Sequence, residues 1–177
     1  AIKTHLQLLP EECTCAAQEE QRQFTAVATR EIDRIDALLE RLIEMRDFPR
    51  ASFVRVDLRE MLVDTLLLLQ DMLTQESVTV VQELQSGCWI RGDREQLKQL
   101  FLNLLMNAGE AVSGCGEIRV RCWARKDRPR ATVVVEISDT GPGIPDTVQE
   151  TLFEPFVTTK AHGTGLGLAI CRAVVDV

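Results

Sequence analysis

The sequence predicts an α+β chain in which a helical hairpin is followed by an α/β sandwich, that is, a sheet with helices stacked on one side. Residues 18–48 contain no glycine or proline and carry a heptad pattern of apolar residues. Pro49 ends this pattern, and mixed helical and strand patterns follow it. A chain of 177 residues with 45% apolar residues can bury the core of one domain and a smaller attached element. We therefore expect the hairpin in residues 1–50 and the sandwich domain in residues 54–177.

The predicted hairpin consists of a short and a long helix. Pro10 and the sequence EECTC separate the long helix from a shorter apolar segment that contains Ile2, Leu6 and Leu9. Two helices alone bury little surface, so we expect the apolar seam of the long helix to pair with a second copy in a four-helix bundle. Packing against the rest of its own chain is the alternative. The seam residues, spaced alternately by three and four, are Thr25, Ala28, Ile32, Ile35, Leu39 and Leu42.

The sandwich domain shows both helical and strand periods. Leu58–Leu73 and Asp93–Val112 are amphipathic and predict helices, and Asp93 with Gln96 resembles a capping box at the start of the second. Strands are predicted over Val78–Leu84, Glu117–Trp123 and Thr132–Ser138, with the KDRPR turn between the last two. The strand over Glu117–Trp123 alternates cleanly, which predicts one face in water. The strand over Thr132–Ser138 carries four apolar residues, which predicts that both its faces are more buried: Val133, Val134, Val135 and Ile137.

Composition narrows the class of protein. The formal net charge is -7, from 27 acidic and 20 basic residues, which argues against a nucleic-acid binder. The six cysteines are scattered without the spacing of a metal site, and reduced structural cysteines suit a cytoplasmic compartment. No apolar run approaches the ~20 residues that span a bilayer. The sequence begins in a helical pattern without an initiator Met or a signal peptide, so we expect a piece of a longer protein with a possible sensory part upstream.

Two asparagines on the second predicted helix are candidate ligands. Asn103 and Asn107 lie one turn apart beside the apolar face, so both amides can face one cavity. An amide oxygen is a suitable ligand for Mg²⁺ that takes its other oxygens from water and phosphates. Taken alone, the pair also fits helix caps or surface amides.

The sequence SDTGPGIP directly follows a strand that is rich in valine. Asp139, at the strand end, can accept a hydrogen bond from an exocyclic amine such as that of adenine. Gly141 and Gly143 allow the backbone to approach the ring. The alternative is a plain turn, which also uses Asp, Gly and Pro.

A glycine-rich loop precedes the last apolar segment. A loop of this kind at a helix N-terminus favours phosphate oxygens, because free N–H groups and the helix dipole meet there. Lys160 adds a mobile positive charge, and the hydroxyls of Thr158 and Thr159 add donors. The pattern is neither a P-loop nor a Rossmann fingerprint. The candidate ligands of this region are Thr159, Lys160, Gly163, Thr164, Gly165, Leu166 and Gly167.

The ordered set NLLMNA, DTGPGIP, FEPFVTTK and GTGLGL resembles the N, G1, F and G2 boxes of histidine kinases, within the wider family that includes gyrase, Hsp90 and MutL ATPases. The resemblance covers residues 54–177 and implies the Bergerat (GHKL) fold. The hairpin is similar to the dimerisation and histidine-phosphotransfer domain of the same kinases. The TTK and AHGTGLGL sequences look most like the nitrogen-regulation branch.

The resemblance implies a role for each motif. Asn107 is expected to bind Mg²⁺, Asp139 the adenine amine, and the glycines of the last loop the phosphates of ATP, with Lys160 assisting. Related ATPases place a water-activating glutamate where this chain has Asn103, which cannot act as a carboxylate base and so favours transfer to a protein over hydrolysis.

The resemblance also implies that the phosphoacceptor histidine lies upstream of Ala1, and that one or two strands after the last helix are missing. His5 lacks the acidic neighbour and the downstream Asn-Pro of the acceptor pattern, and His162 fits a loop residue better than a base.

Three functions remain open from the sequence. The first is the core of a homodimeric sensor histidine kinase, which uses ATP and Mg²⁺ and passes phosphate to a response regulator. The second is an ATPase or a protein serine kinase on the same fold, and the third is a dimerisation module that no longer binds nucleotide.

Overall fold

The computed structural model describes residues 24–29, 32, 52–112, 114–126, 131–160 and 163–176. The chain divides into two compact units, Ala1–Phe48 and Pro49–Val177. None of the described helices is long and apolar enough to cross a membrane.

The described part of the first unit is helical, as the heptad pattern predicts. Thr25 is buried and Ala28 and Ile32 are half-buried, whereas Phe24 and Val27 are exposed. The three described residues of the seam are therefore less exposed to solvent than the two apolar residues outside it. The other seam residues, the segment with Ile2, Leu6 and Leu9, and His5 lie outside the described residues, and pairing with a second copy stays a prediction.

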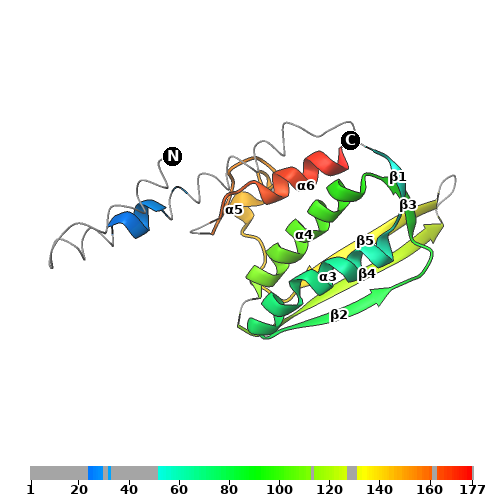
Figure 1. The fold of residues 1–177 in the computed structure, drawn as a ribbon, viewed down its shortest axis with the longest axis horizontal. Helices are drawn as coiled ribbons and strands as arrows, with labels where there is room; N and C mark the ends of the chain where they lie inside the picture. The colour runs from blue at the N-terminus through cyan, green and yellow to red at the C-terminus, as the bar shows by residue number, and fades with distance from the viewer. Residues whose placement is uncertain are drawn as a thin grey trace. The chain divides into compact units, whose positions relative to one another are not determined.

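The second unit alternates strands and helices (Figure 1). Both long predicted helices and all three predicted strands are confirmed, with ends that differ by a few residues at most. The strands β1 and β3 were not predicted, because four residues are too few to show a strand period. The elements are β1 (Val54–Asp57), α3 (Leu58–Gln75), β2 (Val78–Leu84), β3 (Trp89–Gly92), α4 (Arg94–Ala111), β4 (Gly116–Lys126), β5 (Ala131–Asp139), α5 (Asp146–Gln149) and α6 (Gly167–Val175).

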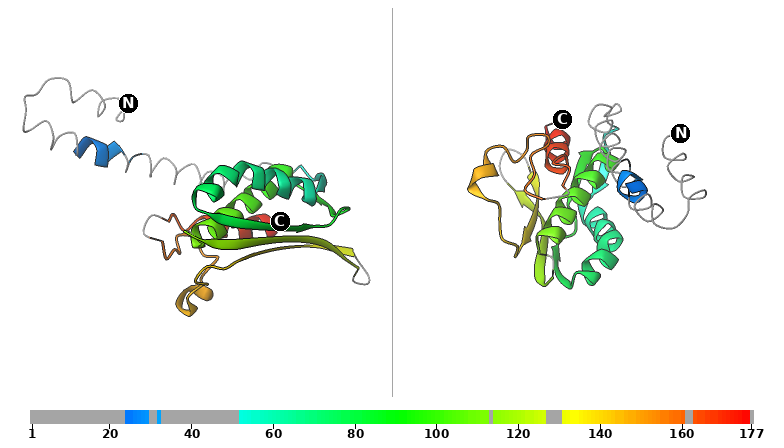
Figure 2. Two further views of the ribbon diagram at one scale, coloured as in Figure 1. Left: turned by 90° about the horizontal axis from the view of Figure 1, so that it is seen from below. Right: turned by 90° about the vertical axis from the view of Figure 1, so that its left-hand side faces the viewer.

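The main sheet has the strand order β2-β4-β5. β2 is parallel to β4, and β4 is antiparallel to β5. β1 and β3 form a separate antiparallel pair, with Val56 opposite Ile90. The three longer helices α3, α4 and α6 lie together on one side of the main sheet (Figure 2), which is the predicted sandwich.

The start of α4 is fixed by Asp93. Its Oδ1 accepts hydrogen bonds from the backbone N–H groups of Glu95 and Gln96 at 3.0 and 3.1 Å, and its Oδ2 accepts one from Ser52 N at 2.9 Å. These donors, Gln96 first, hold the pKa of Asp93 below its usual value. The predicted N-cap is confirmed. Gln96 Nε2 is buried without a hydrogen-bond partner among the described residues.

One apolar core joins the helices to the sheet. The inward residues of β4 are fully buried, and α3 and α4 contribute the largest number of the remaining buried side chains. This arrangement fixes α4 between the sheet and the neighbouring helices. The fully buried apolar residues of this core include Leu62, Leu105, Ile118, Val120, Cys88 and Cys122.

The apolar residues of β5 are half-buried on both faces of the sheet. Among the described strands of this sheet, β4 lies between β2 and β5, and Val133, Val135 and Ile137 of β5 reach the core but are half-buried. Val134 points to the other face, where it stands opposite Trp123 of β4. Apolar content alone does not tell an edge strand from a central strand, because that depends on which strands pair.

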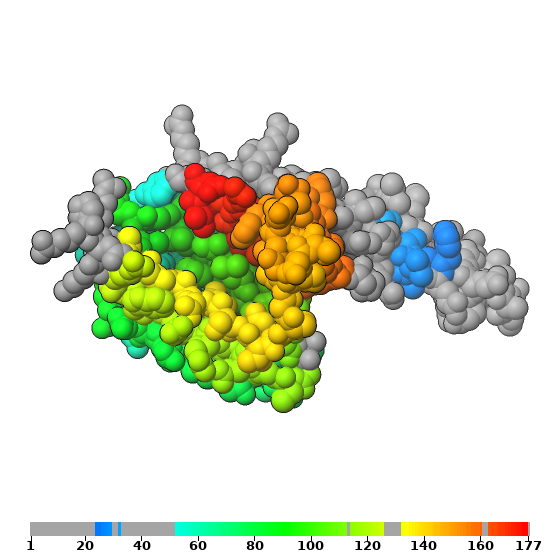
Figure 3. Space-filling model, turned by 180° about the vertical axis from the view of Figure 1, so that it is seen from behind, coloured from blue at the N-terminus to red at the C-terminus, as the bar shows by residue number. Residues whose placement is uncertain are grey.

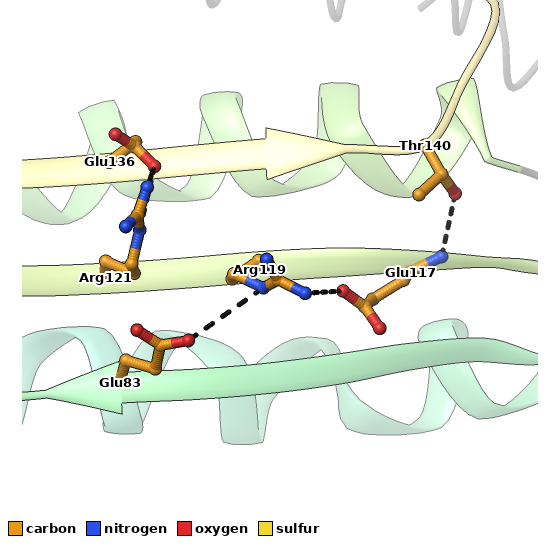
Figure 4. A network of polar contacts seen from close by, with 6 residues as sticks. All are labelled: Glu83, Glu117, Arg119, Arg121, Glu136 and Thr140. Carbon is orange, nitrogen blue, oxygen red and sulfur yellow. Dashed lines mark hydrogen bonds and ion pairs between the residues drawn. The ribbon is translucent and has the colours of Figure 1, made fainter.

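The face of the sheet that points away from the helices carries ion pairs between neighbouring strands (Figure 4). Arg121 of β4 pairs with Glu136, which stands directly opposite on β5. Arg119 pairs with Glu117 at 2.7 Å and lies 4.0 Å from Glu83 of β2. Such exposed pairs contribute ~0–1 kcal/mol each. They make this face polar, as the alternation of β4 predicts.

Candidate nucleotide-binding site

The two asparagines of α4 face the beginning of α6. Both are half-buried. A Cβ atom placed on Gly167, the first residue of α6, would lie 3.7 Å from Asn103 Oδ1 and 3.9 Å from Asn107 Nδ2. Asn103 Nδ2 is buried and has no hydrogen-bond partner among the described residues. The structure therefore brings together two segments that the sequence analysis selected independently.

Asp139 ends β5 on the inward face of the sheet, because it pairs with the fully buried Ile118. Its side chain is exposed, and its Oδ1 accepts a hydrogen bond from Gly141 N at 2.9 Å. A Cβ on Gly141 would lie 2.9 Å from Ala111 O, so only glycine permits this approach to the end of α4. Gly143 is exposed and has a positive φ of 77°. The G1 box thus lies against the same helix as the asparagines.

Thr140 is a structural member of this site that the sequence analysis did not single out. Its N–H donates to Glu117 O at 3.1 Å, and its hydroxyl accepts from Glu117 N at 2.9 Å. These bonds extend the pairing of β4 and β5 by one residue beyond Asp139 (Figure 4). The hydrogen bonding between β4 and β5 therefore continues on both sides of Asp139, which fixes the position of its backbone. The sequence could not indicate this pairing of Thr140 with Glu117, because threonine is also common in turns that make no such bonds.

The F box and the glycine loop are tied together. Phe156 N donates to Gly165 O at 3.0 Å. Gly165 has a positive φ of 66°, and a Cβ there would overlap the main chain of Phe156, so glycine is required on two grounds. Within this loop, Lys160 N donates to the hydroxyl of Thr158 at 3.1 Å, and Gly163 N donates to Lys160 O at 3.2 Å. Thr159 is exposed on the same turn, and His162 lies outside the described residues.

The side chain of Lys160 returns to α4. Its Nζ donates to Asn107 Oδ1 at 3.1 Å and forms an ion pair with Glu110. Two predicted site residues that are far apart in the sequence thereby meet. Glu110 was not predicted, although it lies three residues after Asn107, a spacing that places both on one helix face.

The N-terminus of α6 has no side-chain cap. Its N-cap residue, Leu166, is fully buried, whereas Gly165 and Gly167 on either side of it are half-buried. Leu166 N donates to the hydroxyl of Thr164 at 3.4 Å. Gly163 and Thr164 are half-buried. Free N–H groups at the start of a helix of this length favour an anion such as phosphate.

The face of α4 between α6 and β5 can be followed in Figure 3, where green atoms of α4 are visible between the red atoms of α6 and the yellow atoms of β5. The donor set on this face fits a nucleotide with a divalent cation. Asn107 Oδ1 already accepts from an ammonium group, so it points toward a cationic position. Within the described residues, no group of three or more His, Cys, Asp or Glu side chains forms a metal site, so phosphates and water would complete the coordination.

Comparison with known proteins agrees with this site. Residues 92–177 match the family described as "Histidine kinase-, DNA gyrase B-, and HSP90-like ATPase", whose domain binds ATP. The signal transduction histidine-protein kinase AtoS of Escherichia coli K12 is 35% identical over 177 residues, which are 99% of this chain and 28% of AtoS. The sensory histidine kinase/phosphatase NtrB of Rhodobacter capsulatus is 46% identical over 94 residues, 48% of this chain and 26% of NtrB. The chain thus spans less than a third of either relative.

Among solved structures, the catalytic domain of the histidine kinase ThkA is 31% identical with a TM-score of 0.63, over 71% of this chain and 80% of that one. The structure of ThkA with the response regulator protein TrrA shares the fold, at 22% identity and a TM-score of 0.70, over 99% of this chain and 49% of that one. The motifs, the fold and these similarities agree. The chain therefore belongs to the sensor histidine kinases of two-component systems, on their NtrB-like branch, and carries their catalytic ATPase domain.

Proposed function

We propose that this domain binds Mg²⁺ and ATP on the face of α4 described above and transfers the γ-phosphoryl group to a histidine of the dimerisation hairpin. One observation carries the proposal: Lys160 of the F box reaches Asn107 of the N box, beside the N-terminus of α6. A cation, an amide oxygen and a helix N-terminus are the groups that a triphosphate requires.

Each predicted residue has a distinct part in binding. Asp139 accepts a hydrogen bond from the adenine amine, and Gly141 and Gly143 leave room for the ring. Asn107 holds Mg²⁺, which neutralises phosphate charge when it is bound. The loop from Thr159 to Gly167 surrounds the phosphates through main-chain N–H groups and the ammonium of Lys160.

Asn103 favours phosphoryl transfer over hydrolysis. Its amide can orient a phosphate or water but cannot accept a proton as a carboxylate does. Phosphoryl transfer depends mainly on positioning and charge neutralisation, so it needs no base at this position. The reacting imidazole would then come from a histidine upstream of Ala1.

The whole protein is proposed to act as a homodimer in the cytoplasm. Pairing through the heptad seam would present the acceptor histidine, and an aspartate of a response regulator would receive the phosphate. The complex of ThkA with TrrA supports such a partner by analogy of fold.

Calorimetric titration with Mg·ATP tests the binding step. The wild-type chain should bind, and Asp139→Asn should bind about 10- to 100-fold more weakly, because a hydrogen bond to a charged group contributes ~1.5–3 kcal/mol. Asp64→Asn is the matched control, since Asp64 lies on α3 in an exposed pair with Arg94. Absence of binding in the wild type would support the third function, a dimerisation module without nucleotide.

Incubation with ATP labelled in the γ-phosphate tests the transfer step. The chain alone should remain unlabelled, and a hairpin fragment that carries the upstream histidine should acquire acid-labile label when it is added. Stable acid-labile label on the chain alone would refute the upstream acceptor. Phosphate release that disappears in Asn103→Ala would instead favour an ATPase.

A further inference from the structure

Glu110 is the charged group nearest to the predicted cation ligand that the proposed function leaves without a role. It lies on α4, one turn after Asn107, and its carboxylate forms an ion pair with the ammonium of Lys160. The same ammonium donates to Asn107 Oδ1 at 3.1 Å. An exposed lysine from the F box is thus held by two residues of one helix.

We propose that Glu110 is a positioning residue that holds Lys160 over Asn107 in the nucleotide-free protein, so that the ammonium occupies the cation position until a metal–nucleotide complex displaces it. This inference rests on the proposed function for the identity of the displacing ligand. The part of the proposal that concerns the protein without nucleotide depends only on the contacts among Lys160, Asn107 and Glu110.

The two cations exclude each other at Asn107. A Mg²⁺ ion bound to Asn107 Oδ1 would lie at contact distance from the ammonium that donates to the same oxygen, and the two positive charges would repel each other. Lys160 must therefore leave this oxygen when the metal binds. The phosphates that arrive with the metal offer the ammonium a new set of anionic partners.

The pair is suited to displacement because it is weak. The side chains of Lys160 and Glu110 are 41% and 49% exposed, and pairs of that kind contribute between nothing and about fivefold to an equilibrium. Glu110 thus orients Lys160 without competing strongly against a triphosphate. A buried pair would oppose nucleotide binding much more.

Chemical labelling of lysine amines tests whether Glu110 holds Lys160 in the protein without nucleotide. Reductive methylation, followed by mass spectrometry of the 177-residue chain, gives the labelling rate at Lys160, with Lys98 of α4 as the internal reference. Glu110→Gln should raise the rate at Lys160 by about 1.5- to fivefold, because the ammonium loses its counter-ion. Glu110→Asp should keep most of the protection.

The matched control is Glu83→Gln. It removes the same charge from an exposed ion pair, with Arg119, on the face of the sheet that points away from α4. It should leave the rate at Lys160 unchanged. Equal rates at Lys160 in the wild type and Glu110→Gln would overturn the proposal, as would an equal increase in the control.

Saturation with Mg·ATP tests the displacement. Once the metal–nucleotide complex is bound, Lys160 should label at the same rate in the wild type and in Glu110→Gln, since Glu110 no longer holds it. A difference that persists at saturation would overturn the displacement. If calorimetry shows that the wild type binds no Mg·ATP, the proposed function fails instead, and the nucleotide-free comparison still decides whether Glu110 holds Lys160.

Discussion

The described cysteines show how burial alone sets the chemistry of a residue. Cys88, Cys122 and Cys171 are buried, whereas Cys115 is exposed. Loss of solvation raises the pKa of Cys122 to about 12, and the neighbouring Cys88 thiol adds to the shift. Burial raises the pKa of Cys171 to about 11. All three buried thiols pack as small apolar groups of the core, which agrees with the structural role that we expected from their scattered spacing.

Thiol labelling at pH 8 should therefore separate these residues. Cys115 should react with iodoacetamide in the native protein, and Cys122 and Cys171 should react only after unfolding, because the thiolate is the reactive form. Peptide mapping by mass spectrometry gives the rates. Native-state labelling of Cys122 as fast as Cys115 would contradict the burial that the structure gives it.

The same thiols predict a loss of stability in alkali. Their pKa values are raised in the folded state above the ordinary value of 9.0, so the stabilisation is complete below pH 9 and is lost as the pH rises toward 11. Urea unfolding at pH 8, 9 and 10 measures it. Cys171→Ala should show a smaller decrease than the wild type over this range, and an identical decrease would contradict the assignment to Cys171.

At the scale of the element, α4 is the helix on which the site depends. It carries Asn103, Asn107 and Glu110 on one side and Leu105 in the core, and its N-terminus is fixed by Asp93. Asp93 also binds Ser52 N, which ties the beginning of the second unit to this helix. The helix that presents the amides is thus anchored at its start and packed along its length.

Replacement of Asp93 tests the anchor. Asp93→Ala should reduce the free energy of unfolding by ~1 kcal/mol, whereas Asp93→Asn should lose less because asparagine also caps helices. The carboxylate has a lowered pKa, so its stabilisation is present above 3.8 and is lost as the pH falls through the lowered value. The difference between Asp93→Ala and the wild type should accordingly shrink as the pH falls below 3.8, as measured by urea unfolding.

At the scale of the whole second unit, a single core connects the sheet, α3 and α4. The predicted site residues on α4 and at the end of β5 are therefore positioned by the same packing. A substitution that loosens the core should also displace these residues. The two tryptophans of the chain, Trp89 and Trp123, both lie in this unit, on β3 and β4. Their fluorescence reports its unfolding.

A matched pair of leucines tests the core. Leu105 is fully buried, and Leu68 of α3 is 62% exposed. Leu105→Ala should cost ~2–5 kcal/mol of unfolding free energy, because it removes buried methyl groups and leaves a cavity. Leu68→Ala should stay within ~0.5 kcal/mol. Equal losses in urea unfolding followed by tryptophan fluorescence would contradict the layer arrangement.

The sequence by itself determined the elements with a clear period and the content of the site. α3 and α4 span several turns, and β2, β4 and β5 are long enough to show strand character, so each was predicted. The four motifs identified the family and predict the residues of the ATP site, because glycines, amides and a strand-end carboxylate occur there in a fixed order. The Asp93 cap was also predictable, since it depends on residues within three positions of each other.

Only the tertiary structure decided the relations between residues far apart in the chain. It placed β4 between β2 and β5, paired the four-residue strands β1 and β3, and joined Lys160 to Glu110 across 50 positions. It also buried Leu166, one of the predicted ligands of the glycine loop. Local propensity and spacing act over a few residues, whereas strand partners and side-chain ion pairs depend on how the whole chain packs.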